Sequence, residues 1–380
     1  MLTKLTTQLQ KILNQTSIKF FLKEKRYRFK ELVRLARFWS WQFKRLPNCK
    51  SVNIAFNYWG RKSERAGAIN FLGLDDSIKI DALIKPSVIV SEFPIPGATC
   101  LPLHLSTVIQ LENRTLEDIL MGFQKEKRRL INSQASNFKL KKVSTIEEVM
   151  RLDLEMLRPF ANARYGRGAY NFPLQQLIDM TFNTGHFYLL LHENKEVGCF
   201  IGHFSIRNKK RYWQVDRLGF PEVIFSNMQH YREKNVMVFY LQIEWAITNG
   251  FEYFDMGANC AFTEAGVVHH KRTYGGQLST MGNYSYLYLK LPSAYAAKFY
   301  WGKPLLALEG KAIVLHLGLP NGVNDSELLN RYKLLNFGGL TKVYLHNESQ
   351  FRESAVEVIG NIFSHQKTPP LIVSPTFKPH

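Results

Sequence analysis

The sequence has few cysteines and no long apolar run. Its four cysteines, Cys49, Cys100, Cys199 and Cys260, lie far apart and form no Cys-x-x-Cys pair. This spacing argues against a zinc motif and against a dense disulfide framework. No stretch of about 20 apolar residues occurs, and no apolar N-terminal run ends at a small-residue cleavage site. We therefore expect reduced thiols, no transmembrane helix and a cytoplasmic protein.

Acidic residues are also scarce. The 380 residues include 31 Asp and Glu against 50 Lys and Arg, a net charge of +19. This excess favours an anionic partner, such as a phosphorylated cofactor, nucleic acid, an acidic carrier protein or a membrane surface. Residues 20–47 hold much of it, and their apolar side chains recur at helical spacing: Phe29, Leu32, Val33, Ala36, Trp39 and Phe43. The predicted basic amphipathic helix either packs into its own domain or contacts a membrane surface, a carrier protein or nucleic acid.

The order of predicted elements indicates two domains. Short β-like runs at 52–56, 78–84 and 87–90 predict a first sheet. Helices are expected at 115–135 and 145–158, the second beginning at Ser144-Thr145-Ile146-Glu147, where a hydroxyl cap precedes acidic first-turn residues. Runs at 187–192, 197–206 and 211–218, separated by turn residues, then predict an antiparallel meander.

A helix, a strand and a glycine-rich segment follow the meander. Apolar residues recur at helical spacing at Val236, Phe239, Tyr240, Ile243, Ala246 and Ile247. Asn235 is the expected N-terminal cap and Gly250 the left-handed exit. Residues 251–256 read as a short buried strand that Gly257 ends, leaving Asp255 at a strand end. Residues 266–276 then finish with Lys-Arg-Thr-Tyr-Gly-Gly.

These motifs resemble the second half of the Fem-type (FemAB) and related GNAT-like acyltransferases. The matching residues are Trp245-Ala246, Asp255-Met256-Gly257 and the run from Gly266 to Gly276, and residues 115–131 resemble the basic helix that precedes the second unit of that family. The resemblance implies an α/β (α+β) fold of two tandem units, each a mixed, mostly antiparallel sheet flanked by helices. The expected boundaries are 1–112 for the first unit, 113–143 for the connecting basic helix and 144–300 for the catalytic unit. A tail, 301–380, is expected to return to the first unit and to end in an extended Pro-rich segment.

The predicted strands place two candidate proton acceptors near each other. Alternation puts Cys199, Ile201 and His203 on one face, and Tyr212, Gln214 and Asp216 on one face of the next strand. His203 can accept an amine proton, with Asp216 orienting or replacing it. The alternatives are a core histidine and an aspartate paired with an arginine such as Arg217 or Arg211.

Further site residues are expected mainly from the resemblance. It implies that Lys271 lies at the active site, where a fixed ammonium stabilises oxyanion or phosphate charge. Tyr274 is a candidate acid for the departing thiolate, unless its ring packs at a helix end. Other candidates for substrate binding are Gln214, Arg217, Asp255, Asn259, Arg164 and Tyr165, and for donor phosphate Arg232, Lys234 and Arg272. Adjacent His269 and His270 point about 100° apart on a helix, so no metal site is expected.

The predicted function is N-acyl transfer, possible without a catalytic triad because positioning alone can supply roughly 7–11 kcal/mol. No Arg/Gln-x-x-Gly-x-Gly/Ala loop lies between Arg217 and the following helix, so a carrier-bound thioester is favoured over free coenzyme A. We expect an acyl group, plausibly fatty, to pass from acyl carrier protein or coenzyme A to an amine of a peptide or natural product, with no tightly bound cofactor. The alternatives are aminoacyl-tRNA-dependent transfer to a cell-wall peptide, exopolysaccharide acylation, and a non-catalytic basic module that contacts nucleic acid or a membrane through residues 20–47.

Overall fold

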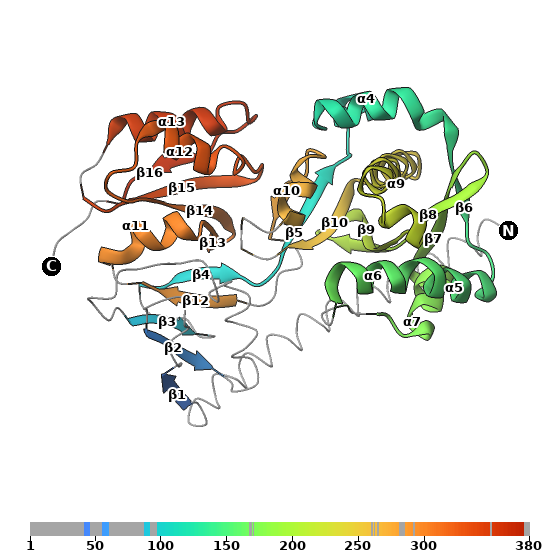
Figure 1. Ribbon diagram of the computed structural model, residues 1–380, viewed down its shortest axis with the longest axis horizontal. Coiled ribbons are helices and arrows are strands. Elements are labelled where there is room, and N and C mark those ends of the chain that lie inside the picture. The colour runs from blue at the N-terminus through green and yellow to red at the C-terminus, as the bar shows by residue number, and fades with distance from the viewer. Residues whose placement is uncertain are drawn as a thin grey trace. The chain divides into compact units, whose positions relative to one another are not determined.

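The computed structural model describes most of the chain beyond residue 96 and three short strands before it. The described residues are 42–45, 55–60, 87–91, 97–166, 169, 171–259, 261, 263, 266–280, 286–291, 293–349 and 352–375. They divide into two compact units that interleave along the chain (Figure 1). Unit 1 contains Val108–Gly257 and Thr273–Gly276. Unit 2 contains the described strands of Lys23–Thr107, together with Ala258–Arg272 and the described residues from Gln277 onward.

Unit 1 is built on a mixed sheet whose strands follow the order β11-β5-β10-β9-β8-β7-β6, with β11 spanning Gln277–Ser279. The strands are β5 (Leu105–Gln110), β6 (Phe138–Lys142), β7 (Gly185–His192), β8 (Lys195–Arg207), β9 (Lys210–Gly219) and β10 (Tyr253–Asn259). The unit boundary crosses β5 before Val108 and β10 after Gly257. β6 to β9 pair antiparallel, whereas β10 runs parallel to β9. The predicted meander is confirmed.

Tight turns join the strands of the meander. Glu193 and Asn194 have φ values of 49° and 63°, and Asn208 and Lys209 have 50° and 65°. Positive φ at both central residues matches the right-handed twist of the flanking strands, which is why such turns join hairpins.

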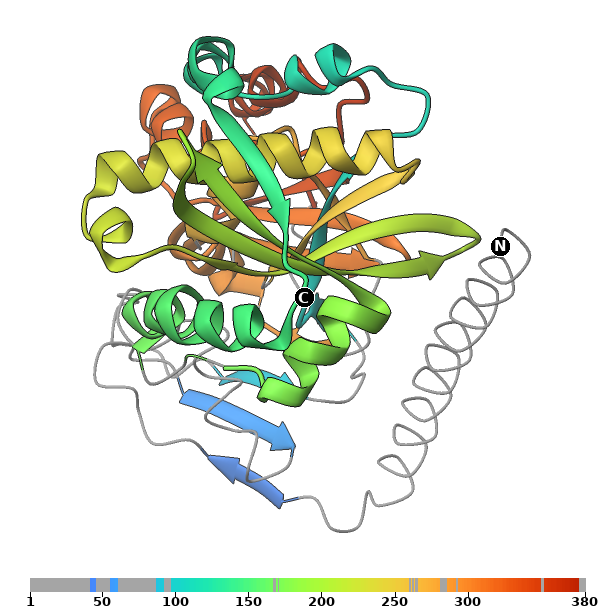
Figure 2. The same cartoon turned by 90° about the vertical axis from the view of Figure 1, so that its right-hand side faces the viewer.

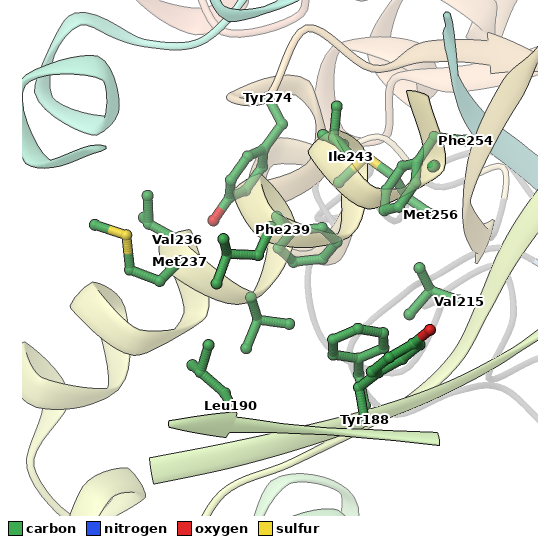
Figure 3. Packing of buried hydrophobic residues seen from close by; sticks show 14 of the residues in the cluster. Tyr188, Leu190, Val215, Val236, Met237, Phe239, Ile243, Phe254, Met256 and Tyr274 are labelled. Carbon is green, nitrogen blue, oxygen red and sulfur yellow. The ribbon is translucent and has the colours of Figure 1, made fainter. Parts of the chain in front are cut away.

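Helices cover both faces of this sheet (Figures 1 and 2). They are α3 (Leu116–Leu120), α4 (Lys125–Gln134), α5 (Ile146–Leu152), a π-helical segment (Asp153–Leu157), α6 (Arg158–Tyr165), α7 (Leu174–Asp179), α8 (Glu222–Phe225) and α9 (Met228–Thr248). α9 packs on one face, where Phe239 and Ile243 meet Leu190, Val215 and Phe254 (Figure 3). On the other face, α5 and α7 bury Val149 and Leu177 against Phe187, Leu189 and Ile201. The predicted hydroxyl cap of α5 is Thr145, whose side chain accepts from the Glu148 N–H at 3.2 Å.

α9 begins seven residues before the position at which the sequence pattern placed its cap. The side chain of Asn227 accepts from the backbone N–H groups of Gln229 and His230 at 3.0 and 3.1 Å. Asn235 lies inside the helix and is buried, so its predicted capping role is wrong. The predicted left-handed exit is correct, since Gly250 has a φ of 68°.

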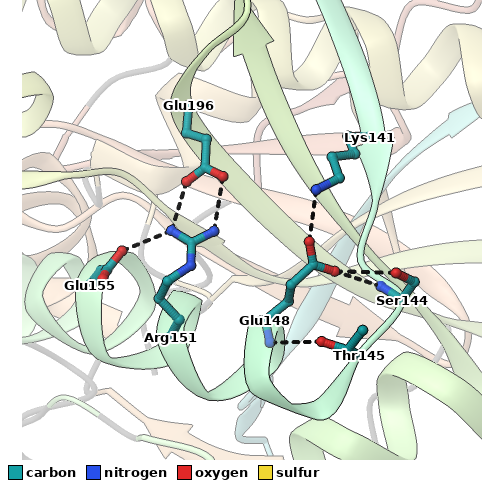
Figure 4. A network of polar contacts seen from close by, with 7 residues as sticks. All are labelled: Lys141, Ser144, Thr145, Glu148, Arg151, Glu155 and Glu196. Carbon is teal, nitrogen blue, oxygen red and sulfur yellow. Dashed lines mark hydrogen bonds and ion pairs between the residues drawn. The ribbon is translucent and has the colours of Figure 1, made fainter.

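A surface network fastens α5 to the sheet (Figure 4). The guanidinium of Arg151 donates to both carboxylate oxygens of Glu196 on β8, at 2.8 and 2.9 Å. Lys141 on β6 donates to Glu148 on α5 at 2.8 Å, and this contact is the first cause that lowers the pKa of Glu148 to about 2. The two ion pairs therefore link α5 to two different strands.

Unit 2 contains a second mixed sheet, of order β1-β2-β3-β12-β4-β13-β14-β15-β16. The strands are β1 (Gln42–Arg45), β2 (Ala55–Gly60), β3 (Ser87–Ser91), β4 (Thr99–Pro102), β12 (Tyr286–Lys290), β13 (Leu305–Glu309), β14 (Ala312–Leu319), β15 (Leu340–Asn347) and β16 (Leu371–Val373). α12 (Asp325–Tyr332) and α13 (Glu353–Phe363) cover one face of β13 to β15. α11 (Ser293–Gly302) packs closely on β14, since an added Cβ at Gly318 would lie 1.8 Å from the Ala297 carbonyl oxygen. Unit 2 also holds α10 (Gly266–Arg272) and β11 (Gln277–Ser279).

The predicted fold class, two mixed sheets flanked by helices, is confirmed, and three local predictions need correction. Gln42–Arg45 form strand β1, not the end of an amphipathic helix; residues 20–41 lie outside the described residues. The helix expected at 115–135 is divided into α3 and α4 around Gly122. Gly257 does not end its strand, because β10 continues to Asn259 through a glycine φ of 85°. Part of the Pro-rich end, which was predicted to be extended, pairs with β15 as strand β16. No helix among the described residues is long and apolar enough to cross a membrane.

Candidate functional site

His203 and Asp216 lie side by side on adjacent strands of unit 1. β8 and β9 pair with a register shift, Ile201 with Arg217 and then Gly202 with Val215, so Asp216 is the additional residue of a β-bulge. Bulges re-aim side chains. Here the carboxylate Oδ2 of Asp216 lies 2.5 Å from Nδ1 of His203.

This contact defines the role that His203 can take. When Nδ1–H donates to the Asp216 carboxylate, Nε2 is left as the proton acceptor of a neutral imidazole. The His203 side chain is 29% exposed and that of Asp216 is 12% exposed. The pair therefore has an oriented ring that solvent or substrate can reach.

A chain of polar contacts extends from this pair to β10. The Gln214 amide donates to the second oxygen of Asp216 at 3.4 Å and accepts from the guanidinium of Arg207. Arg207 also donates to Asp255 at 2.6 Å, and both side chains are more than nine-tenths buried. The backbone N–H of Gly257 donates to the other oxygen of Asp255 at 2.8 Å. Asp255 is thus a buried anchor of the network.

The network lies where two central strands stop pairing. β9 and β10 are paired from Tyr253–Tyr212 to Asp255–Gln214, and the ladder ends there. β9 continues to Gly219 and β10 to Asn259. His203 and Asp216 therefore lie next to the last bonded pair, on the side where β9 and β10 run on without a shared ladder.

Arg207 is a member of this network that the sequence analysis missed. Strand alternation places His203, Ser205 and Arg207 on one face of β8. Its guanidinium also lies 4.9 Å from the ring centroid of Tyr212, which stacks on Tyr253 at 4.6 Å. A charged residue at the end of a mostly apolar strand, on the same face as His203, was the signal that could have identified it.

The other predicted acceptor-side residues lie elsewhere in unit 1. The Arg217 guanidinium lies 4.9 Å from the ring of Phe172. Arg164 donates to the Tyr231 hydroxyl at 2.5 Å, and Tyr165 is exposed.

Two predicted site residues belong to unit 2 and are buried. The Lys271 ammonium donates to the Ala258 carbonyl at 3.1 Å. Asn259 donates to the Leu105 carbonyl at 3.2 Å and to the Thr107 hydroxyl. Both side chains therefore bind backbone or neighbouring strands within unit 2. The predicted part of Lys271 in charge stabilisation stays a prediction.

Tyr274 is fully buried in the core of unit 1. Its ring centroid lies 5.1 Å from that of Phe123 and 4.7 Å from that of Phe239. Figure 3 shows Tyr274 beside Phe239. Burial raises the pKa of its phenol strongly. The next residue, Gly275, has a φ of 72°, and an added Cβ there would lie 3.1 Å from the Gly122 backbone. This position supports the alternative role of Tyr274, in which its ring packs at a helix end and the phenol does not donate a proton.

The three residues predicted to bind donor phosphate have different surroundings. Arg232 on α9 is exposed. Lys234 is buried with its ammonium 5.0 Å from the Phe138 ring, and burial lowers its pKa. Arg272 donates to Asn336 in unit 2, and burial lowers its pKa. Of the three, Arg232 is the one with an exposed side chain.

The described cysteines and histidines form no metal site. Cys100 and Cys199 are free thiols, and burial raises the pKa of Cys100 to about 11. Among the described residues, no three His, Cys, Asp or Glu side chains are grouped to hold a metal ion.

Comparisons with known proteins give only distant structural matches. No family model matches the sequence, and no curated protein matches it. FemX matches over 66% of this chain and 84% of its own, at 10% identity and a TM-score of 0.37. The match to L-PGS from Bacillus licheniformis covers 66% of this chain and 80% of that protein, at 13% identity and a TM-score of 0.32. The match to a GCN5-related N-acetyltransferase from Kribbella flavida covers 69% of this chain and 93% of that protein, at 12% identity and a TM-score of 0.26. Likenesses this distant assign no function.

Proposed function

We propose that the protein is an N-acyltransferase that moves an acyl group from a thioester to an amine. The observation that carries the proposal is the His203–Asp216 contact at 2.5 Å, with a His203 ring that is 29% exposed. Amine acylation needs a base, because a protonated amine has no free electron pair to attack a carbonyl. A neutral imidazole whose Nδ1–H is held by a carboxylate presents Nε2 as the proton acceptor that this task needs.

The proposed reaction uses Nε2 of His203 as the base. The acceptor reacts as a neutral amine, so an ammonium first loses its extra proton to solvent. Nε2 then takes one proton from the amine nitrogen as it attacks, while Asp216 stabilises the resulting imidazolium through Nδ1–H. The amine nitrogen forms a bond to the thioester carbonyl carbon, the carbon–sulfur bond breaks, and the thiolate leaves with the electron pair. The imidazolium or water then returns a proton to the thiolate. The products are one amide and one thiol.

The proposal also specifies a donor and an acceptor. An acyl carrier protein or coenzyme A carries the thioester, and the acceptor is an amine of a peptide or natural product. The net charge of +19 supports an anionic donor. Membrane contact through residues 20–47 also stays a prediction, because residues 20–41 are not among those described.

Product analysis tests this function directly. The full chain would be incubated with acyl thioesters of coenzyme A and of a carrier protein, together with a panel of amines. We expect mass spectrometry to detect an amide, with an equal amount of free thiol. His365→Gln, which changes an exposed histidine of unit 2, serves as the control and should leave the yield unchanged. Thiol release without any amide would indicate a hydrolase and reject the proposal.

A further inference from the structure

Cations gather on α4 and the first turns of α9 in unit 1 without forming ion pairs to any residue that the structure describes. They are Lys125, Lys127, Arg128, Arg129 and Arg232. α4 rests on α9 through Ile131 and Leu130, which join the apolar cluster of Val236 and Phe239. None of the five cations lies within 4.0 Å of a carboxylate oxygen of a described residue.

Elsewhere in unit 1, cations do have acidic partners. Arg151 binds Glu155 and Glu196, and Lys141 binds Glu148 (Figure 4). Lys210 binds Glu112 and Glu252 at 2.6 and 2.7 Å. The five cations of the α4–α9 surface therefore differ from these in having no ion pair to a described residue, although Glu126 and Glu233 lie on the same two helices.

Lys127 occupies a defined position in this surface. Its ammonium lies 4.3 Å from the ring centroid of the buried Tyr274, a contact that limits the side chain to one region. The pKa of Lys127 is lowered first by burial and then by the charge of Arg232, against the smaller opposing effect of Glu126. Two cations from the packed helices α4 and α9 thus repel each other, and the charge of Glu126 offsets this repulsion only in part.

Arg232 projects from a well-anchored part of α9. The neighbouring Tyr231 packs on Phe160 and Phe220 at 5.6 and 5.3 Å and accepts a hydrogen bond from Arg164 at 2.5 Å. Arg232 itself is exposed and makes no hydrogen bond to a described residue. Its guanidinium is therefore available to a ligand at a site whose backbone is held in place.

We propose that Lys127 and Arg232 form a binding site for a phosphate group of the donor. The inference rests on the proposed acyl transfer, because it names the part of the donor that this chain binds. A phosphate placed between the two cations removes their repulsion and gains charge-assisted hydrogen bonds. A guanidinium offers paired donors to phosphate oxygens, whereas an ammonium acts as a point charge. Side chains from two helices thus replace the glycine-rich loop that the sequence lacks.

Three donors carry such a phosphate: coenzyme A, the 4′-phosphopantetheine of a carrier protein, and aminoacyl-tRNA. Calorimetric titrations of the full chain with coenzyme A, 4′-phosphopantetheine, pantetheine and an RNA hairpin distinguish them. We expect at least one phosphate-bearing probe to bind about tenfold more tightly than pantetheine. The probe whose affinity depends on Lys127 and Arg232 identifies the source of the phosphate.

Two variants and one control test the residues. Lys127→Met keeps an apolar contact with Tyr274 and removes the charge, and Arg232→Gln changes an exposed side chain. Each should raise the Kd of that probe about tenfold. Lys195→Met, at the exposed β7–β8 turn, removes the same unit of charge and should leave the Kd within about twofold. Equal affinity in all four proteins, an equal loss in the control, or no binding of any probe by the wild type would overturn the proposal.

Binding and turnover separate this inference from the proposed function. Lys127-dependent binding of a phosphate probe with no amide on any amine would leave the phosphate site standing and reject acyl transfer. Amide formation by Lys127→Met and Arg232→Gln with an unchanged donor KM would reject the phosphate site and leave acyl transfer standing.

Discussion

Two histidine pairs, one in each unit, differ in partner and in exposure. In unit 1, Nδ1 of His203 contacts the carboxylate of Asp216, and the ring is 29% exposed. In unit 2, Nδ1 of His316 on β14 lies 2.9 Å from Nε2 of His346 on β15. The ring centroids of Tyr300 and Tyr344 each lie 5.0 Å from the ring centroid of His316. A carboxylate stabilises an imidazolium, whereas a second neutral imidazole does not.

The surroundings of the unit 2 pair keep it neutral. Burial lowers the pKa of His316 to about 3, with a further contribution from His346, and burial lowers the pKa of His346 to about 4. Neither group then exchanges a proton near neutral pH. The comparison teaches that the position of a histidine on a strand does not decide its use. Its partner and its access to solvent separate a candidate base from a packing residue.

The largest expected effect comes from breaking the buried part of the unit 1 network. Arg207→Met leaves the Asp255 carboxylate, 1% exposed, without its cation, which typically costs about 3–5 kcal/mol. Urea unfolding measures this loss. Arg211→Met, at an exposed arginine on the same sheet, should cost about 1 kcal/mol or less. Equal values for the two variants would contradict a buried ionic anchor beneath His203.

An intermediate effect is expected from acid on the unit 2 pair. The ordinary histidine pKa is 6.5, and the folded values are about 3 and 4, so between these limits the unfolded chain binds more protons than the folded one. The stability due to this pair is complete above pH 6.5. It decreases as the pH falls below 6.5, by on the order of 1 kcal/mol per pH unit for each such histidine.

A single variant isolates that contribution. His346→Gln retains a hydrogen-bonding partner for His316 and removes one titrating group, so its unfolding free energy should fall less between pH 7 and pH 5 than that of the wild type. His365→Gln, an exposed histidine of the same unit, should behave as the wild type does. Urea unfolding at both pH values provides the measurement, and an identical fall in all three proteins would refute a neutral buried pair.

The smallest effect is expected at Tyr274, whose hydroxyl was a candidate acid. Its ring packs between Phe123 and Phe239, so Tyr274→Phe should keep the acyl-transfer rate within about threefold and the unfolding free energy within about 1 kcal/mol. Tyr274→Ala should instead lose about 3–5 kcal/mol through the cavity it leaves. A fall in rate of a hundredfold in Tyr274→Phe would restore the phenol as a proton donor.

Sequence patterns predicted the strands of unit 1 better than the ends of its helices. Alternation located β7 to β9, because one sheet face must bury Phe187 and Leu189 while turn residues interrupt the apolar runs. The start of α9 was placed too late. Polar residues before Val236 hide a helix whose cap, Asn227, is recognised only from its two backbone hydrogen bonds.

The candidate site was predictable in part. Strand alternation placed His203 and Asp216 on facing positions, but not at 2.5 Å, because that distance depends on a bulge that no local pattern specifies. Arg207 was missed since its partners, Gln214 and Asp255, belong to other strands. Likewise, the electrostatic repulsion between Arg232 and Lys127 acts between two helices that are about 100 residues apart in sequence. Such contacts arise from tertiary packing, which a single-sequence pattern does not contain.

The most direct measurement is the rate of thiol release and amide formation by His203→Gln beside the wild type. The account predicts a fall in kcat/KM of at least about 100-fold, the usual range for loss of a general base, with an unfolding free energy within about 1 kcal/mol of the wild type. Asp216→Asn should fall less and shift the pH profile, since it retains a hydrogen-bonding partner but loses the charge that stabilises the imidazolium. A His203→Gln rate within about threefold of the wild type would contradict the assignment of His203 as the base.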